Sequence, residues 1–428
     1  MRFTIFVISV FTLVVCSCKK NENGTVTLPF KIISVSPDTG SIGTTVTIVG
    51  TNLNGLDSVK LNGKLCSIKT NNGDTVSITL PKAAGSGPIT IIFDDSTITW
   101  PGFHFRFTNY VTTVAGNGKD AKTNGVGTNA SFSFPYEILF NSKGNLIVGM
   151  YSYNPSLKMV DQAANVTTFA GNPVMGLVDG GPGIAEFGNS VGAMALGKND
   201  TVYVVDHDYN RIRKVAPDGH VITYAGNGQG GQDNGPVASA SFLSIAAMAF
   251  DAVGNLFFSD GYYIRKISTD GIVSFFVGNG TAGSKDGTGT AASLAGPGPL
   301  WFDKKGILYV IDAYKIRRIT PDGVITTDAG SAQQHALDSL AAQAGSWGFN
   351  TMIADDEGNL YFSDETKIRM VSTDGQVSTL AGTEVYGFAD GPALTAMFED
   401  PYGLAFDKDH NLWIADPHNQ RIRKLIIQ

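Results

Sequence analysis

A six-residue motif recurs along most of the chain, and it constrains the fold more than any other feature. In its fullest form the motif reads Val-Thr-Thr-Val-Ala-Gly, and its copies end at six glycines spaced 52 to 55 residues apart: Gly116, Gly171, Gly226, Gly278, Gly330 and Gly382. A column of aliphatic residues, each followed by Lys or Arg, keeps nearly the same period: Leu157, Ile212, Ile264, Ile316, Ile368 and Ile422. Repeats of about 50 residues that hold four short strands and Gly-rich turns are typical of β-propeller blades. The expected fold class is therefore all-β.

The same period predicts how the ring of blades closes. The sixth repeat stops at Gln428 before its fourth strand, whereas an unmatched copy of that strand, residues 111–116, precedes the first complete repeat. We expect this strand to pair beside residues 421–427, which gives six blades within residues 109–428. Closure of this kind leaves no unpaired strand edge in the last blade.

Two hairpins carry a family resemblance. The segments Asp206-His-Asp-Tyr-Asn-Arg-Ile-Arg213 and Asp416-Pro-His-Asn-Gln-Arg-Ile-Arg423 resemble the NHL repeat. The resemblance covers about residues 111–428 and implies a six-bladed β-propeller of the NHL type. The third to fifth repeats depart from the pattern through a shorter hairpin, and the first has Met150 where the others have Asp.

Residues 29–108 lack the repeat of 52 to 55 residues, which indicates a separate domain. Alternating hydrophobic and polar residues at 45–49 and 77–80 are typical of strands in a small antiparallel sandwich. The run Pro-x-x-Gly-x-x-Gly from Pro37, followed by Val-x-Ile-x-Gly-x-Asn-Leu from Val46, resembles the IPT/TIG immunoglobulin-like domain. The resemblance implies a spacer or adhesion module beside a larger functional domain.

The first 18 residues have the layout of a bacterial signal peptide. Arg2 precedes an apolar run that ends at Val15, and the small residue Ser17 stands before Cys18. The Ser17-Cys18 pair resembles a lipobox, which implies lipidation of Cys18, a polar tether at residues 19–28 and an anchor in the outer membrane, on its surface or periplasmic side. An ordinary cleaved signal is the alternative. Either cleavage leaves Cys66 without a partner for an internal disulfide.

The charge distribution excludes one class of partner. The formal net charge is −7, and the basic residues are scattered rather than clustered. Nucleic acids need a concentrated basic surface, so we expect no nucleic acid partner. We expect the protein to be a monomer.

Acidic residues form two columns within the repeats. One column ends the second strand: Asp206, Asp260, Asp312, Asp364 and Asp416. The other stands eight residues after each motif glycine: Asn124, Asp179, Asn234, Asp286, Asp338 and Asp390. We interpret the first as partners of hairpin amides or of the nearby Arg, and the second as turn residues. Calcium remains an alternative for the second column, although one residue per loop supplies too few oxygens. We expect no cofactor.

Aromatic residues gather in the loops that should share one face of the propeller. They follow the second strands, start the inner strands or lie in connections, and Glu137 is the only ionisable residue in its inner-strand column. Aromatic rings beside polar loops form stacking platforms for sugars or peptides. The candidate ligand-binding residues are Tyr136, Glu137, Tyr151, Tyr153, Tyr209, Tyr262, Tyr263, Tyr314, Trp347 and Tyr402.

These features favour a binding protein over an enzyme. We expect a lipid-anchored, exported protein whose propeller binds a polysaccharide or oligosaccharide. A protein-binding or adhesion scaffold is one alternative. The other is a metal-assisted lyase or hydrolase at the channel mouth, which would require Glu137, Asp206, Asp416 and His418 to converge, joined by His207.

Overall fold

The computed structural model describes residues 30–40, 44–81, 86–105, 109–152, 156–313, 315–329, 349–373 and 377–427. The chain divides into two compact units, one within residues 1–108 and one at residues 109–427. In the described residues every extended element is a β-strand, and the helical elements are single 3₁₀ turns: η1 (Gly127–Asn129), η2 (Lys198–Asp200), η3 (His207–Tyr209), η4 (Gly289–Ala291) and η5 (Ala393–Thr395). None of the helices in these residues is long and apolar enough to cross a membrane.

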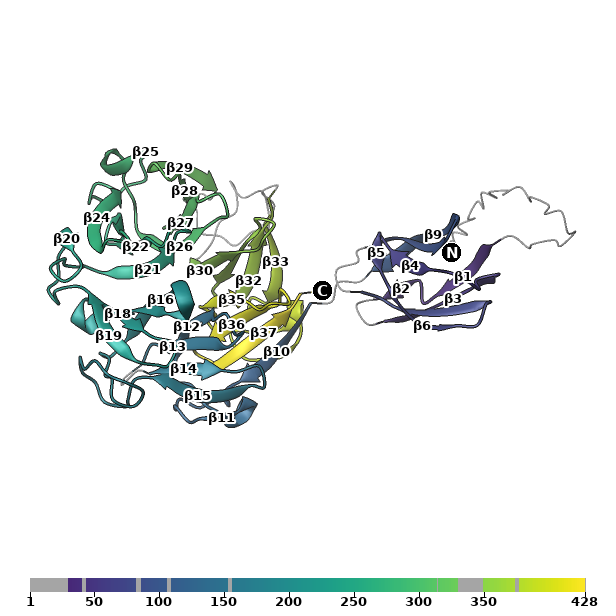
Figure 1. The fold of residues 1–428 in the computed structure, drawn as a ribbon, viewed down its shortest axis with the longest axis horizontal. Helices are drawn as coiled ribbons and strands as arrows, with labels where there is room; N and C mark the ends of the chain where they lie inside the picture. Colours follow the sequence, from purple (N-terminus) through teal and green to yellow (C-terminus); the bar gives the residue numbers. More distant parts are fainter. Residues whose placement is uncertain are drawn as a thin grey trace, which may run out of the picture. The chain divides into compact units, whose positions relative to one another are not determined.

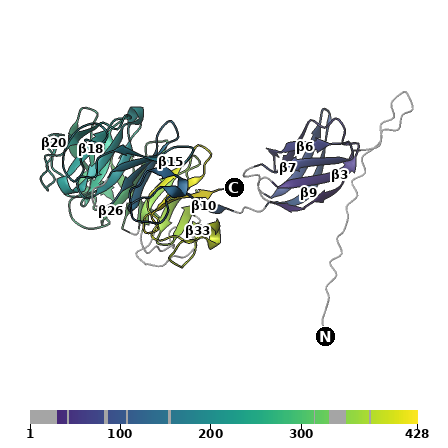
Figure 2. The ribbon, with the colours of Figure 1, turned by 90° about the horizontal axis from the view of Figure 1, so that it is seen from below.

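The first unit is a sandwich of two sheets. One sheet has the order β1 (Lys31–Ser36), β3 (Thr45–Thr51), β7 (Thr75–Thr79) and β6 (Ser67–Asn71). The other has the order β2 (Thr39–Gly40), β9 (Ser96–Phe105), β8 (Gly87–Phe93), β4 (Ser58–Leu61) and β5 (Lys64–Leu65). Figure 2 shows the two sheets facing each other, with β3, β6 and β7 in one layer and β9 in the other.

Alternation along these strands builds the core of the sandwich. Val46 and Ile48 of β3 face Ile89 and Ile91 of β8 in one buried cluster, and the intervening residues remain partly exposed. Cys66 is buried in the same cluster as a small apolar residue, and burial raises the pKa of its thiol to about 11. This is the alternation that the sequence predicts.

The second unit contains six sheets. The first sheet, from its inner strand outward, has β12 (Pro135–Phe140), β13 (Leu146–Met150), β14 (Leu157–Val160), β15 (Asn165–Ala170) and β11 (Gly125–Val126). The second has β16 (Val191–Leu196), β17 (Val202–Asp206), β18 (Arg211–Val215) and β19 (Val221–Ala225). The third has β21 (Ile245–Phe250), β22 (Leu256–Asp260), β23 (Tyr263–Ile267), β24 (Ile272–Val277) and β20 (Gly235–Pro236).

The other three sheets follow the same plan. The fourth sheet has β26 (Pro297–Phe302), β27 (Leu308–Asp312), β28 (Lys315–Ile319), β29 (Val324–Ala329) and β25 (Gly287–Thr288). The fifth has β30 (Phe349–Ala354), β31 (Leu360–Asp364), β32 (Lys367–Val371) and β33 (Val377–Gly382). The sixth has β35 (Leu404–Phe406), β36 (Leu412–Asp416), β37 (Arg421–Ile426), β10 (Tyr110–Ala115) and β34 (Gly391–Pro392). The sixth sheet therefore combines strands from both ends of the unit.

The sheets form a closed ring. The inner strands contact each other in the cycle β12, β16, β21, β26, β30, β35 and back to β12, and Figure 1 shows them gathered around the middle of the unit. In the sixth sheet β10 pairs antiparallel with β37, with Val111 opposite Leu425. The ring closes by main-chain hydrogen bonds between strands from the start and the end of the unit.

The motif glycines have a steric role at the end of each fourth strand. Gly226 has a φ of +101°, and a Cβ there would lie 2.5 Å from the carbonyl oxygen of Asn210. Gly278 has a φ of +110°, and its Cβ would collide with the carbonyl oxygen of Tyr262. Only glycine combines this conformation with so close an approach to the neighbouring hairpin. This geometry accounts for the recurrence of the motif glycine.

Candidate functional site

In five of the six sheets a buried arginine pairs with the aspartate that ends the second strand. The pairs are Asp206–Arg213 (3.1 Å), Asp260–Arg265 (2.6 Å), Asp312–Arg317 (2.8 Å), Asp364–Arg369 (3.1 Å) and Asp416–Arg423 (2.7 Å), all between buried side chains. The aspartate also accepts backbone N–H bonds; Asp312, for example, accepts from Ala295 (2.6 Å) and Gly296 (2.8 Å). The interpretation of this column as structural is confirmed for these sheets.

The second polar column meets the same arginines. Their guanidiniums bond to Asp179 (2.8 Å), Asn234 (3.0 Å), Asp286 (2.9 Å) and Asp390 (2.7 Å). Asp338 lies outside the described residues. The sequence interpretation as turn residues missed the shared arginine, because spacing alone does not show that the two columns converge.

The first sheet replaces the arginine with a lysine. Lys158 is buried, and its Nζ donates to the carbonyl oxygen of Lys122 (2.8 Å), to Asn124 Oδ1 (2.7 Å) and to Thr168 Oγ1 (3.0 Å). Burial, together with the charge of Lys122, lowers the pKa of Lys158 to about 8. The first sheet has Met150 in the aspartate column, so Lys158 bonds to the segment at residues 122–124 without a buried carboxylate as its partner.

Three tyrosines form a cluster where the sixth sheet meets the first. We call this place the closing junction. The rings of Tyr136, in β12, and Tyr402, just before β35, are stacked with centroids 3.6 Å apart and planes at 22°. Tyr151, just after β13, lies 5.2 Å from the Tyr136 ring. Tyr136 and Tyr402 are half-buried, whereas Tyr151 is 47% exposed. The cluster therefore presents an open aromatic surface.

A glycine explains why the two inner strands approach so closely here. The Gly403 N–H donates to the carbonyl oxygen of Tyr136 at 2.8 Å. A Cβ at Gly403 would lie 2.6 Å from that oxygen and 3.1 Å from Glu137 Cα. The corresponding column positions of the other sheets hold larger residues, namely Glu137, Ala193, Ala247, Pro299 and Thr351. The missing side chain lets the residue just before β35 bond directly to β12, and it allows Tyr136 and Tyr402 to stack.

Glu137 supplies the electrostatic character of the cluster. Its side chain is half-buried, and burial raises the pKa of its carboxyl to about 8. The pKa of Tyr402 is raised to about 12, by burial first and then by Glu137. Burial and the neighbouring Tyr402 raise the pKa of Tyr136 as well. At neutral pH the cluster therefore consists largely of uncharged hydroxyl and carboxyl groups, which both donate and accept hydrogen bonds.

Residues that flank the cluster in sequence also meet at this junction. The rings of Phe134 and His418 make an edge contact at 4.7 Å, and His418 Nε2 lies 3.4 Å from Asp400 Oδ2. The Phe134 N–H donates to Gln420 Oε1 at 2.6 Å. Sequence reasoning missed Phe134 and Asp400, and both have a positive φ that no local signal in the sequence indicates.

The other candidate residues do not contribute ring contacts to this cluster in the described part of the chain. Tyr263 stacks on Phe275 at 4.2 Å within the third sheet, Tyr209 is half-buried in η3, and Tyr262 is exposed. Four further predicted positions lie outside the described residues: Cys18, Tyr153, Tyr314 and Trp347.

The residues of the enzyme alternative have other partners. Asp206 and Asp416 are fully buried against their arginines, and His418 contacts Phe134 and Asp400. His207 is partly buried, which lowers the pKa of its imidazole. Among the described residues no three His, Cys, Asp or Glu side chains are grouped so that they could hold a metal ion.

Comparison with known proteins supports the two-part architecture. Residues 29–107 match the family model of the IPT/TIG domain. The chain is 28% identical to Teneurin-3 of Mus musculus over 223 residues, which make up 45% of this chain and 8% of that protein. It is 27% identical to Teneurin-4 of Homo sapiens over 285 residues, 58% of this chain and 10% of that protein. The chain thus spans a tenth or less of the length of these curated relatives.

Solved structures resemble nearly the whole chain. A protein of unknown function from Bacteroides thetaiotaomicron has a TM-score of 0.65 and 22% identity, covering 95% of this chain and 99% of that one. An auxiliary nutrient binding protein from Bacteroides ovatus has a TM-score of 0.60 and 17% identity, covering 93% and 98%. At such identities the likeness concerns the fold alone. Together with the IPT/TIG match, it confirms an all-β chain with an immunoglobulin-like domain followed by a propeller.

Proposed function

We propose that this protein is an exported, lipid-anchored binding protein whose NHL-type propeller holds a polysaccharide or oligosaccharide at the closing junction. The observation that carries the proposal is the contact among Tyr136, Tyr402 and Tyr151 beside Glu137. Solvent-exposed aromatic rings next to hydroxyl and carboxyl groups suit a ligand with flat apolar faces and many hydroxyls. A sugar ring has both properties.

The exposed Tyr151 ring is the expected platform. Tyr136 and Tyr402 cover one another, so each has one face committed to packing, whereas Tyr151 keeps 47% of its surface open. Glu137 would bond to ligand hydroxyls as a neutral acid, which avoids the cost of burying a charge under the ligand. The half-buried Tyr209 and the exposed Tyr262 lie outside this cluster, and binding there does not require them.

The names of similar structures support a nutrient-capturing role. Two of them, from Bacteroides thetaiotaomicron and Bacteroides ovatus, are auxiliary nutrient binding proteins. Their bacterial source is consistent with an anchor at Cys18 and a place in the cell envelope. Replacement of Cys18 by Ala should release the protein from the membrane fraction and abolish its labelling with palmitate, and retention of both would contradict the anchor.

The binding test uses the chain from residue 19 onward, a glycan array and polysaccharide affinity gels, each run with Ca²⁺ and with EDTA. We expect one polysaccharide to retard the protein in both conditions and the Tyr151→Ala variant to lose about tenfold in affinity, because it removes the open ring. Tyr262→Ala, which removes a tyrosine of similar exposure outside the cluster, is the matched control and should bind normally. Equal binding by Tyr151→Ala would contradict the assignment, and failure of all glycans would favour a protein ligand.

A further inference from the structure

Neighbouring sheets of the ring are sealed by a pair of large side chains. At five of the six junctions, the last residue of one sheet's inner strand packs against a residue of the preceding sheet, namely the second residue of that sheet's second strand. Four of these pairs are edge-to-face aromatic contacts: Tyr203–Phe250 (4.9 Å), Phe257–Phe302 (5.1 Å), Tyr361–Phe406 (4.9 Å) and Trp413–Phe140 (5.4 Å). A fifth joins Ile147 to Leu196 in one apolar cluster.

Between the fourth and fifth sheets, at what we call the open junction, one member of this pair is small. There the column that holds Phe or Leu elsewhere has Ala354, and the residue it should meet is Tyr309. Both residues pack against one apolar cluster shared by the two sheets, but Ala354 brings no large side chain to Tyr309, and both line a cavity of about 710 Å³. An engineered cavity that follows loss of one large side chain holds roughly 150 Å³. The space at the open junction is several times larger and lies in the range of small-molecule sites.

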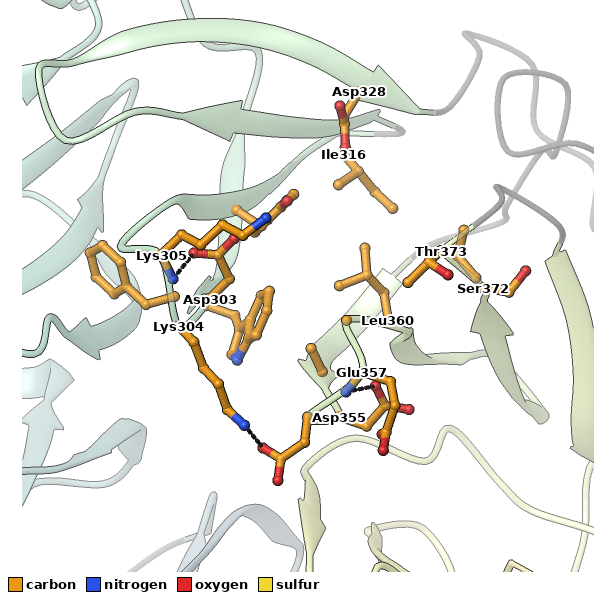
Figure 3. Close-up of a pocket in the computed structure, with 17 residues that line it drawn as sticks. Asp303, Lys304, Lys305, Ile316, Asp328, Asp355, Glu357, Leu360, Ser372 and Thr373 are labelled. Carbon is orange, nitrogen blue, oxygen red and sulfur yellow. Dashed lines mark hydrogen bonds and ion pairs between the residues drawn. The ribbon is translucent and has the colours of Figure 1, made fainter. Parts of the chain in front are cut away.

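The cavity has walls from both sheets. Figure 3 shows Ile316 and Leu360 pointing toward its open centre from opposite sides, with Asp303 and Lys304 on one flank and Ser372 and Thr373 on the other. Lys304 Nζ bridges the two sheets through Asp356 at 2.8 Å. The ion pair links the two walls at one side of the cavity.

An aromatic platform forms part of the wall. The rings of Trp301 and Tyr309 are stacked with centroids 5.3 Å apart and planes at 28°, and both residues line the cavity. Since Ala354 supplies no ring, the platform has no edge-to-face partner from the fifth sheet in the described residues. A stack of two parallel rings offers a flat face rather than the surrounding cage that quaternary ammonium groups need.

Both hydrogen-bond donors and acceptors line the cavity. The lining carries five carboxylates and two lysines, together with the hydroxyls of Ser372 and Thr373. Asp303 and Asp355 accept hydrogen bonds from the backbone of their own turns. In contrast, the side chains of Lys305, Asp328 and Glu357 make no hydrogen bond within the described part of the chain. The excess of carboxylates disfavours an anionic ligand.

We propose that the cavity at the open junction is a second ligand site, which binds a short neutral oligosaccharide. One sugar ring stacks on the platform of Trp301 and Tyr309, and hydroxyls of the different sugar units bond to Lys305, Asp328 and Glu357, which lie on different sides of the cavity. Sugar hydroxyls donate and accept equally, so they match a lining that mixes ammonium and carboxylate groups. This site shares no residue with the tyrosine cluster and stands independently of it.

The test titrates the chain from residue 19 onward with maltotriose, cellotriose, xylotriose and mannotriose by calorimetry, beside trigalacturonate and spermidine as charged probes. Ala354→Phe should restore the missing ring, fill the space beside Tyr309 and abolish binding of the neutral trisaccharide. Trp301→Ala removes the platform and should weaken binding by at least about tenfold. Leu196→Phe places a new ring in the same column at another junction, and Tyr151→Ala alters the tyrosine cluster. Both should leave this binding unchanged.

The outcomes separate the two sites. Binding of a neutral trisaccharide that Ala354→Phe and Trp301→Ala lose, and that Tyr151→Ala keeps, supports the second site even if the tyrosine cluster binds nothing. Binding lost only in Tyr151→Ala overturns the second site and supports the cluster. The proposal is also overturned if no neutral trisaccharide binds, or if only trigalacturonate or spermidine does.

Discussion

The closing junction and the open junction have the same backbone plan but opposite packing. At the closing junction Gly403, just before β35, bonds directly to β12 because it has no side chain, and the Trp413–Phe140 pair seals the sheets. At the open junction Ala354 stands where the other inner strands end in Phe or Leu, and a cavity of about 710 Å³ lies beside it. One small residue thus allows a direct hydrogen bond between neighbouring sheets, and another leaves space for a cavity between them.

The comparison shows where a repeat protein acquires specific chemistry. The buried Asp–Arg pairs are the same in five sheets and hold each sheet together. The residues that could meet a ligand are those that break a column: Glu137 and Gly403 at one junction, Ala354 at the other. We therefore expect stability to depend on the residues that recur, and the two proposed ligand sites use residues that do not recur.

The largest expected effect on the free energy of unfolding concerns the buried Asp–Arg pairs, which are present in at least one sheet at each junction. Arg423→Met in the sixth sheet and Arg317→Met in the fourth should each lower the free energy of unfolding by about 3–5 kcal/mol, because Asp416 and Asp312 would remain buried without a partner. Urea unfolding measures both. Arg318→Met, an exposed neighbour on the same strand, should cost less than about 0.5 kcal/mol. Losses as small as that for the buried arginines would show that the pairs do not support the sheets.

A smaller effect should distinguish the closing junction. Gly403→Ala forces β35 away from β12, since its Cβ would lie 2.6 Å from the Tyr136 carbonyl oxygen, and should cost about 1–3 kcal/mol. Gly298→Ala, on the inner strand of the fourth sheet, places its Cβ 3.7 Å from the nearest atom and should be tolerated. Thermal unfolding of the two variants gives the comparison. Equal losses would mean that the close approach at Gly403 is unimportant.

The titration of Glu137 should give a third effect, dependent on pH. The folded pKa of about 8 exceeds the ordinary value of 4.5, so the folded state holds the proton more tightly. This contribution is fully present below about pH 4.5 and is lost as the pH rises through 8. Glu137→Gln should therefore gain about 1–2 kcal/mol relative to the parent at pH 8 and little at pH 4. A constant difference between pH 4 and pH 9 would contradict the raised pKa.

The smallest effect concerns the open junction without ligand. Ala354→Phe should raise the free energy of unfolding by about 0.5–1.5 kcal/mol, because a ring at this position can meet Tyr309 as Phe250 meets Tyr203. Differential scanning calorimetry of the parent and of Leu196→Phe, which adds a ring where Leu196 already packs with Ile147 in one apolar cluster, provides the comparison. A loss of stability in Ala354→Phe alone would show that the cavity walls cannot accept the ring.

The repeat made the fold class predictable, because each strand is marked by its own pattern. The motif glycine ends each fourth strand, and its positive φ near the preceding hairpin explains why no other residue replaces it at Gly226 or Gly278. The IPT/TIG domain was likewise predicted from the glycines and alternating residues after Pro37, and the family match at residues 29–107 confirms it. The glycines at turns and the alternation of apolar and polar residues along the strands are therefore sufficient to predict the fold class.

The arrangement of the sites could be predicted only in part. Tyr136, Tyr151, Tyr402 and Glu137 were recognisable as candidates, but their contact depends on Gly403 and on the register between the sixth and first sheets. Ala354 is visible as a small residue among Phe and Leu, yet its consequence requires knowing that Tyr309 lies across the junction. Such contacts join residues of different sheets, and no spacing within one repeat encodes them.

The most direct test of the account is hydrogen exchange measured by mass spectrometry, with and without the polysaccharide that affinity gels identify. A polysaccharide bound at the closing junction should slow exchange in residues 134–138, 149–152 and 400–404, which hold the tyrosine cluster, and should leave exchange at Tyr262 and in the IPT/TIG domain unchanged. Unaltered exchange in all three segments, with protection elsewhere in the chain, would contradict a binding site at the closing junction.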